Sequence, residues 1–323
     1  MTSSTSTTTT TVEPLPNPAL PATNAAFDAL AAGNAAVSMT VLRDGVPVLR
    51  RATGATVDGA AATTDSPMVV ASVSKLLTAG SVARLVAGGL IDLAGPVPWD
   101  RLGIVPHPGW YDVTVRELLD HTSGMPVARR MWFDGQGTCA TTLPFLVAGP
   151  PADHRGEWTY SNGNYCALGL LVEAVTGRSL VVAVNGLLAD PVGARGVHLT
   201  TDGVRAGDVP YALGVERLSR LGGAGAFLVS TDTIAAVLTS ITPSDRVTMS
   251  WPSVMTDQYG WGHTGTVDGA KACAWVLEAG RTIVVTTVSG GRPATGGGVC
   301  DLTVPAIAGD LGIGAGEPER SPV

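Results

Sequence analysis

Strand-like segments lie near both ends of the chain and helical segments occupy the middle, and this order constrains the fold more than any other feature. Near the N-terminus, the alternating residues 38–43, an Asp-Gly turn and the apolar residues 46–49 predict a β-hairpin. Near the C-terminus, residues 271–277 and 281–288 predict two further strands. The simplest packing places both ends of the chain in one sheet, with the middle inserted as a helical lobe.

Helical patterns occur between and beside these strands. Residues 74–87 are small or aliphatic nearly all round, which is typical of a buried helix, and a Gly-Gly pair ends it. The glycine tract 296–298 predicts a loop. The predicted helices span residues 24–35, 74–87, 164–176, 232–239 and 302–311.

We therefore expect an α+β fold, an α/β sandwich whose central antiparallel sheet is flanked by helices and which carries an inserted, mostly helical lobe. The sheet domain is expected to combine residues 21–85 with residues 245–315, and the lobe to span residues 86–244. Residues 1–20 predict a disordered Ser/Thr/Pro tail, and residues 316–323 predict a second, short tail.

Composition limits the classes of function. A chain of 323 residues with 45% hydrophobic and 15% charged side chains is typical of a folded protein with a large core. The net charge of −7 excludes a nucleic-acid partner. No apolar run reaches the roughly 20 residues of a membrane span, so no membrane partner is expected. The N-terminus lacks the basic and apolar regions of a secretory signal, which predicts a cytoplasmic protein.

The cysteines predict neither a disulfide framework nor a metal site. Four cysteines are few for a chain of this length, no two form a CxxC pair, and cysteine tends to be buried as a free thiol. We expect free thiols, no metal and no cofactor. The four residues are Cys139, Cys166, Cys273 and Cys300.

Ser72 and Lys75 give the first chemical signal, at the start of the predicted helix 74–87. A serine hydroxyl needs a nearby base to act as a nucleophile at neutral pH. Positions three apart share a helix face, so the Lys75 amine can reach the Ser72 hydroxyl. Burial lowers the pKa of a lysine, which allows the amine to accept a proton. The alternative is a chance Ser-x-x-Lys sequence in which a capped helix carries a surface lysine.

Two later motifs favour the catalytic interpretation. Tyr160-Ser161-Asn162 opens a predicted helix, and His263-Thr264-Gly265 precedes a predicted strand. In this order, the three motifs resemble the SxxK, YxN and KTG-type set of the penicillin-binding protein and serine β-lactamase superfamily, which includes class C β-lactamases, DD-peptidases and esterases.

Two further segments carry the same resemblance. Residues 115–126 are similar to the family's "TxxxLLxHTSGLP" segment, and residues 221–232 are similar to its glycine-rich "GGLxSTxxD" segment. The resemblance covers roughly residues 25–310, which is nearly the whole folded part. It implies the β-lactamase/transpeptidase-like fold.

The resemblance also implies a role for each catalytic residue. Ser72 would be the nucleophile that becomes acylated, and Lys75 would share or accept its proton. Tyr160 would act as a general base, which requires that the nearby Lys75 lower the pKa of the phenol from its usual value of about 10.

The substrate-binding residues follow from the same resemblance. Asn162 would hydrogen-bond Lys75 and the substrate amide. His263, Thr264 and Gly265 would line the substrate site. The oxyanion hole would consist of two backbone N–H groups, those of Ser72 and Thr266.

His263 departs from the family pattern, because β-lactamases and most DD-peptidases carry a lysine there. A histidine is only partly charged near neutral pH, and we expect a positive charge on His263 only below about pH 6. A fixed contact to a substrate carboxylate is therefore missing, which makes β-lactamase or DD-peptidase activity less favoured.

Two activities remain open for the acyl-Ser72 intermediate. The favoured one is a serine hydrolase that acts on an ester or a small amide or peptide bond. The alternative is a cytoplasmic acyltransferase that passes the acyl group to an amine or alcohol in natural-product biosynthesis. A non-catalytic binding protein on the same scaffold is disfavoured by the intact set of motifs.

Other side chains receive structural interpretations. His121 is expected to be a scaffold residue bonded to backbone, and His198 a surface or loop residue. Phe133 is expected to pack in the helical lobe, with a place in an acyl pocket as the alternative. Tyr259 and Trp261 flank the third motif and would line the cleft.

Overall fold

The computed structural model describes residues 19–133, 137–249 and 255–316. The two predicted tails, over residues 1–20 and 316–323, lie almost entirely outside these ranges.

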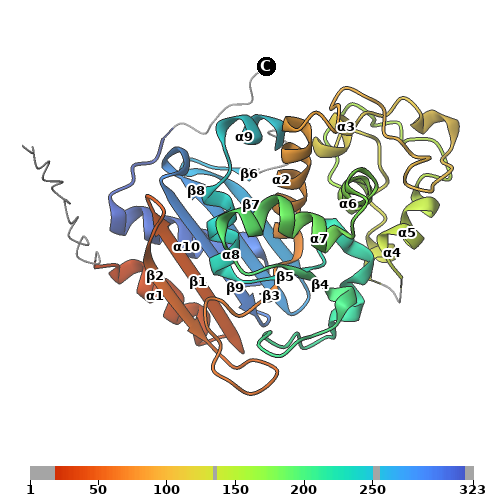
Figure 1. Ribbon diagram of the computed structural model, residues 1–323. Helices are drawn as coiled ribbons and strands as arrows, with labels where there is room; N and C mark the ends of the chain where they lie inside the picture. The colour runs from red at the N-terminus through yellow and green to blue at the C-terminus, as the bar shows by residue number, and fades with distance from the viewer. Residues whose placement is uncertain (1–18, 134–136, 250–254, 317–323) are drawn as a thin grey trace, which may run out of the picture.

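A six-stranded sheet joins the two ends of the chain (Figure 1). Every neighbouring pair of its strands is antiparallel, and Ala36 near the N-terminus pairs with Ser289 near the C-terminus. The predicted central antiparallel sheet is therefore confirmed. In spatial order, the strands are β2 (Val46–Thr53), β1 (Ala36–Arg43), β9 (Thr282–Ser289), β8 (Ala270–Leu277), β7 (Gly260–Val267) and β6 (Met255–Thr256).

Helices cover both faces of this sheet, as Figure 1 shows. The helices α1 (Pro21–Ala31) and α10 (Gly296–Leu311) pack together on one face, whereas α8 (Thr231–Thr239) contacts β1 and β9 from the other. The valine-, threonine- and isoleucine-rich strand β9 is buried along its whole length between these layers, a position that suits β-branched side chains.

The predicted loop at residues 296–298 is wrong, because α10 begins there. The Thr295 side chain caps the helix by accepting a hydrogen bond from the Gly298 N–H. A Cβ on Gly296 would lie only 2.2 Å from the carbonyl oxygen of Gly265. The glycine therefore allows a close approach of helix and sheet instead of marking a loop.

The remaining elements form the part of the molecule beside the sheet. A second, three-stranded sheet has the order β3 (Met68–Val69), β5 (Phe227–Val229) and β4 (His198–Leu199). The helices are α2 (Ser74–Ala87), α3 (Val115–Leu119), α4 (Arg129–Phe133), α5 (Cys139–Leu146), α6 (Asn162–Thr176), α7 (Leu180–Val184) and α9 (Pro243–Met249). Short helical turns include η1 (Ala71–Val73), η2 (Pro108–Trp110), η3 (Asn185–Ala189), η4 (Asp190–Val192), η5 (Thr200–Asp202), η6 (Val215–Ala224) and η7 (Glu278–Gly280).

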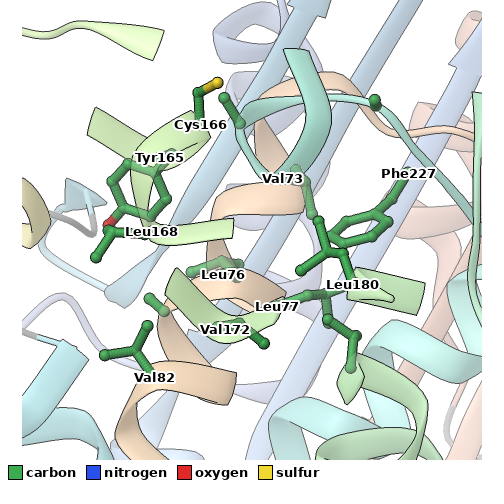
Figure 2. Close-up of a cluster of buried hydrophobic side chains, with 14 of the residues drawn as sticks. Val73, Leu76, Leu77, Val82, Tyr165, Cys166, Leu168, Val172, Leu180 and Phe227 are labelled. Atoms are coloured by element: carbon green, nitrogen blue, oxygen red, sulfur yellow. The ribbon is translucent and has the colours of Figure 1, made fainter. Parts of the chain in front are cut away.

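The helix α2 runs through the largest hydrophobic core and has the predicted bounds. Figure 2 shows its side chains among those of α6 and β5, with Leu76 and Leu77 close to Leu168, Val172 and Phe227. The predicted domain boundary between residues 85 and 86 falls inside this helix. The division into a sheet domain and an inserted lobe stays a prediction.

The cysteines correct the expectation of free thiols. Cys139 of α5 is bonded to Cys166 of α6, and Cys273 of β8 is bonded to Cys300 of α10. In both pairs, the partners are 27 residues apart in sequence. The packing of their elements brings their Cα atoms to 5.4 Å in the first pair and 5.2 Å in the second. Disulfides are rare in the cytosol, so this pairing weighs against the predicted cytoplasmic location.

Within residues 19–133, 137–249 and 255–316, no single helix is long and apolar enough to cross a membrane. One bent pair, Asn162–Thr176 with Leu180–Val192, is long and apolar enough when its two helices are taken together.

The strand β7 approaches η1 so closely that only a glycine fits at position 265. A Cβ there would lie 2.1 Å from the backbone oxygen of Val70, just before η1. We expect Gly265→Ala to lower the free energy of unfolding by about 1–3 kcal/mol, because one of the two backbones must shift. Gly291→Ala is the matched control, since nothing lies within 4 Å of a Cβ at that position.

Urea unfolding of both variants measures this difference. Equal stability of Gly265→Ala and Gly291→Ala would show that β7 and η1 have room to separate at little cost.

Candidate active site

Ser72 lies in η1, the short turn that leads into α2. The residue before it, Ala71, has a φ of +48°, a left-handed conformation that is costly for a side chain with a Cβ. The turn is held by hydrogen bonds from the Val73 N–H to the Val70 oxygen and from the Val70 N–H to the Phe227 oxygen. The surrounding structure thus fixes the backbone that presents the Ser72 hydroxyl.

Lys75 lies one helical turn after Ser72 and has no exposed surface. Its Nζ is 3.3 Å from Ser72 Oγ, 2.9 Å from Asn162 Oδ1 and 2.6 Å from the Ala224 backbone oxygen. Burial lowers its pKa well below the usual value of 10.5, because the charged form loses its hydration.

These three contacts suit a neutral amine. A neutral primary amine has two N–H donors and one lone pair, and Asn162 Oδ1 and the Ala224 oxygen can accept the two N–H bonds. The lone pair is then available to the Ser72 hydroxyl, which is the geometry of a base next to its nucleophile. The surface-lysine alternative is wrong.

Tyr160 contacts the nucleophile from the other side. Its hydroxyl donates a hydrogen bond of 2.8 Å to Ser72 Oγ, and Lys75 Nζ lies 4.8 Å from the centre of its ring. Burial raises the pKa of the phenol to about 12, and the hydrogen bond to Ser72 lowers it only in part. The expected lowering of this pKa by Lys75 is wrong, because burial of the phenol raises it. Tyr160 is a protonated donor at neutral pH.

The hydrogen bonds of Lys75 connect three distant parts of the chain. Asn162 is the first residue of α6, whose N-terminus is capped by Ser161 accepting from the Gly163 N–H. Ala224 ends η6, in the glycine-rich segment 221–225. Sequence reasoning missed the Ala224 carbonyl, because a backbone acceptor leaves no signature in residue type. The glycine-rich segment was the only available signal.

The third motif lies on β7, where the strand passes the cleft. The strand β6 pairs only with Trp261 and Gly262, so residues 263–267 have no strand partner on that side among the described residues. Thr264, Thr266 and Ser72 line the same cleft. An oxyanion hole formed by the N–H groups of Ser72 and Thr266 stays a prediction.

His263 is buried, with 5% of its surface exposed, and its Nδ1 lies 2.6 Å from the Thr264 oxygen. Burial lowers its pKa to about 4, because the protonated ring would lose its hydration. His263 therefore becomes positively charged only at a lower pH than the expected value of about 6. At neutral pH, His263 offers a neutral imidazole to the cleft.

His121 lines the cleft, and its bond to a backbone N–H agrees with the expected scaffold role. Its ring lies 4.7 Å from that of Tyr160 and 5.2 Å from that of Tyr165, between centroids. Nδ1 is in contact with the Ser161 N–H and the Asn164 amide, so it acts as an acceptor and the proton lies on Nε2. The His121 ring packs against the Tyr160 ring and helps to hold it in place.

The cleft around Ser72 has a volume of about 650 Å³ and a largely apolar wall. Phe133 belongs to this wall, as the alternative interpretation had it, and Trp158 is a wall residue that sequence reasoning missed. Tyr259 and Trp261 do not line it, so that expectation is wrong. The apolar lining residues are Val127, Phe133, Trp158, Leu221, Met255 and Val267.

Within residues 19–133, 137–249 and 255–316, no group of three His, Cys, Asp or Glu side chains is placed to hold a metal ion.

His198 is buried rather than on the surface, and its Nε2 lies 2.9 Å from Asp208 Oδ2.

Comparison with known proteins identifies the class. Residues 23–304 match the family model described as Beta-lactamase, so the chain belongs to that family. A segment is 31% identical over 172 residues to "Esterase EstB" of Burkholderia gladioli, covering 46% of this chain and 42% of the esterase. The chain thus matches less than half the length of this curated relative.

Solved structures of other proteins share the fold of this chain. The D-amino acid amidase from Ochrobactrum anthropi SV3 superposes with a TM-score of 0.73 at 18% identity, covering 89% of this chain and 99% of the amidase. A D-stereospecific amidohydrolase from Streptomyces sp. gives a TM-score of 0.67 at 21% identity, covering 84% of this chain and 94% of the other. At 18% and 21% identity, these structures show that the chain shares the fold of the two amide-cleaving enzymes.

The burial of His263 predicts a pH-dependent stability. Its pKa is about 4 in the folded protein and about 6.5 in an unfolded chain. As the pH falls from 7 to 4, the unfolded state binds a proton at this residue and the folded state does not, so stability is lost in that window. The difference between the two pKa values corresponds to about 3 kcal/mol.

The measurement is urea unfolding at pH 7 and pH 4 for wild type and His263→Gln. We expect the wild type to lose about 3 kcal/mol more than the variant over this interval. His107→Gln, at an exposed histidine, is the control. If wild type and His263→Gln lost stability equally, His263 would not be held neutral by burial.

Proposed function

We propose that this chain is a hydrolase that cleaves an ester or a small amide through an acyl-Ser72 intermediate. The observation that carries the proposal is the arrangement around Ser72 Oγ, with Tyr160 OH at 2.8 Å and the buried Lys75 Nζ at 3.3 Å. A nucleophile, a base and a proton donor thus lie within reach of one reacting atom.

Acylation follows from the directions of these hydrogen bonds. The Ser72 hydroxyl proton passes to the Lys75 lone pair while Oγ forms a bond to the substrate carbonyl carbon. The carbonyl oxygen gains negative charge, which backbone N–H donors at Ser72 and Thr266 would stabilise. When the bond to the leaving group breaks, Lys75 returns the proton to the departing oxygen or nitrogen through the Tyr160 hydroxyl.

Deacylation uses the same groups in reverse. A water molecule attacks the acyl-Ser72 carbonyl, its proton passes through the Tyr160 hydroxyl to the amine of Lys75, and the ester bond to Ser72 Oγ breaks. Ser72 Oγ regains a proton and the acid product leaves. Tyr160, with its raised pKa of about 12, acts in both steps as a proton relay and not as a phenolate.

The acyl group is expected to be apolar. The cleft wall carries Trp158, Phe133 and Met255, which are 58%, 37% and 45% exposed, respectively, and gain by covering an apolar substrate. The likeness to an esterase and to D-amino acid amidases supports an ester or amide bond as the target. Penicillins and cell-wall peptides are less favoured, because His263 supplies no fixed charge for the carboxylate beside the scissile bond.

Removal of the nucleophile tests the proposal. Ser72→Ala should reduce turnover of phenyl butyrate by about 10⁴–10⁶-fold, as nucleophile truncation does in such catalytic units. Intact-mass spectrometry of the wild type should show a butyryl adduct that Ser72→Ala lacks. Turnover at a near wild-type rate by Ser72→Ala would contradict the proposal.

The same assay examines the acyltransferase alternative, which shares the intermediate and differs in the acceptor. Added amines or alcohols that discharge the butyryl adduct faster than water does would favour a transferase. Discharge at an unchanged rate, with butyrate as product, would favour the hydrolase.

A further inference from the structure

A second cavity of about 410 Å³ adjoins the catalytic cleft. Phe133, Thr266 and Val267 line both spaces, so the cavity continues the cleft past the third motif. It contains two basic side chains, Lys271 and Arg217, whereas the mostly apolar cleft contains one, Arg129.

Lys271 has an unusual position for a lysine. The chain has only two lysines, Lys75 and Lys271, and both are buried, with 0% and 4% exposure. Lys271 Nζ donates one hydrogen bond of 2.6 Å, to the Val267 backbone oxygen. Burial lowers the pKa of Lys271, but the nearby Asp268 carboxylate acts in the opposite direction and supports the charged form. An ammonium group has three N–H donors, so two remain for a ligand in the cavity that Lys271 lines.

Lys271 also lies next to the third motif. It pairs with Thr266 across β7 and β8, and paired residues in antiparallel strands project from the same face of the sheet. Position 263, where the resembling enzymes have their lysine, faces the opposite side of β7, because successive side chains alternate. A positive charge is therefore present on the neighbouring strand, β8, and it lies in the second cavity instead of the catalytic cleft.

Arg217 adds a second positive charge to the cavity. In the described part of the chain, its guanidinium makes no hydrogen bond or ion pair, so its donors are available. One acidic residue, Asp268, lines the cavity as well and partly offsets these charges. Two cations against one carboxylate leave a net positive site beside the reaction centre.

We propose that this cavity binds a carboxylate carried by the substrate, and that the natural substrate is an ester or amide with an apolar acyl group and an anionic tail. The inference rests on the proposed function, because it adds a second binding region to the acyl-Ser72 reaction. Lys271 and Arg217 bind the carboxylate by charge-assisted hydrogen bonds. Phe133 and Val267 pack against the chain that connects the carboxylate to the reacting carbonyl.

Matched neutral and anionic esters test this proposal. Phenyl butyrate is the neutral reference, monophenyl glutarate carries a carboxylate on its acyl side, and 4-carboxyphenyl butyrate carries one on its leaving group. For each anionic ester, the measured quantity is its kcat/KM divided by that of phenyl butyrate. Wild type should prefer at least one of the two anionic esters over the reference, and this preference should weaken as salt is raised.

The variants should change this ratio in opposite directions. Arg217→Gln should lower it about fivefold and Lys271→Met about tenfold, because each removes one cation. Asp268→Asn should raise it about two- to fivefold, because it removes a repelling charge. Arg101→Gln, at an exposed arginine that lines neither space, should leave it unchanged.

The outcomes separate this inference from the proposed function. If Lys271→Met fails to fold, Arg217→Gln and Asp268→Asn still decide the question, since both residues are exposed. Ratios that stay constant across these variants, in an enzyme that still hydrolyses phenyl butyrate through Ser72, would overturn the carboxylate site alone. Hydrolysis of phenyl butyrate by Ser72→Ala would instead overturn the proposed function.

Discussion

The buried amine of Lys75 is the interaction on which the rest of the site depends. An ammonium group without exposed surface would need compensating charge, and here the amine has one amide oxygen, one backbone oxygen and one hydroxyl oxygen as neighbours. These neighbours come from α6, from the end of η6 and from η1, so one side chain fixes three segments around the nucleophile. Burial lowers the pKa of Lys75, which favours the amine as a base, and burial of the Tyr160 phenol raises its pKa so that it stays protonated.

Close backbone approach allows this arrangement. The sheet edge at Gly265 touches the backbone just before Ser72, and Gly296 lets α10 begin against the other side of the same strand. A side chain at Gly265 would push β7 away from the turn that carries Ser72 and so widen the cleft, whereas a side chain at Gly296 would displace α10 from the strand. The glycine at position 265 therefore determines the width of the active site, and the strain at Ala71 shows that the turn on the opposite wall is also held by its surroundings.

Much of the fold and the reacting residues were predictable from the sequence, because both leave local patterns. The all-round apolar pattern of residues 74–87 gave the bounds of α2, and the order of three short motifs placed Ser72, Lys75 and Tyr160 together. Properties that arise from tertiary packing were not predictable. The disulfide pairing depends on which elements pack together, the Ala224 acceptor is a backbone atom, and the direction of the Tyr160 pKa depends on burial that residue type does not reveal.

The protonation state of Lys75 is the most direct test of this account. Because the chain has two lysines, labelling lysine with ¹³C at Cε gives two side-chain signals, which Lys271→Met assigns. The account predicts that burial lowers the pKa of Lys75 far enough for its signal at pH 7 to be that of the neutral amine. A Lys75 signal that is still that of the ammonium form at pH 7 would contradict it, because the base would then have to be another group.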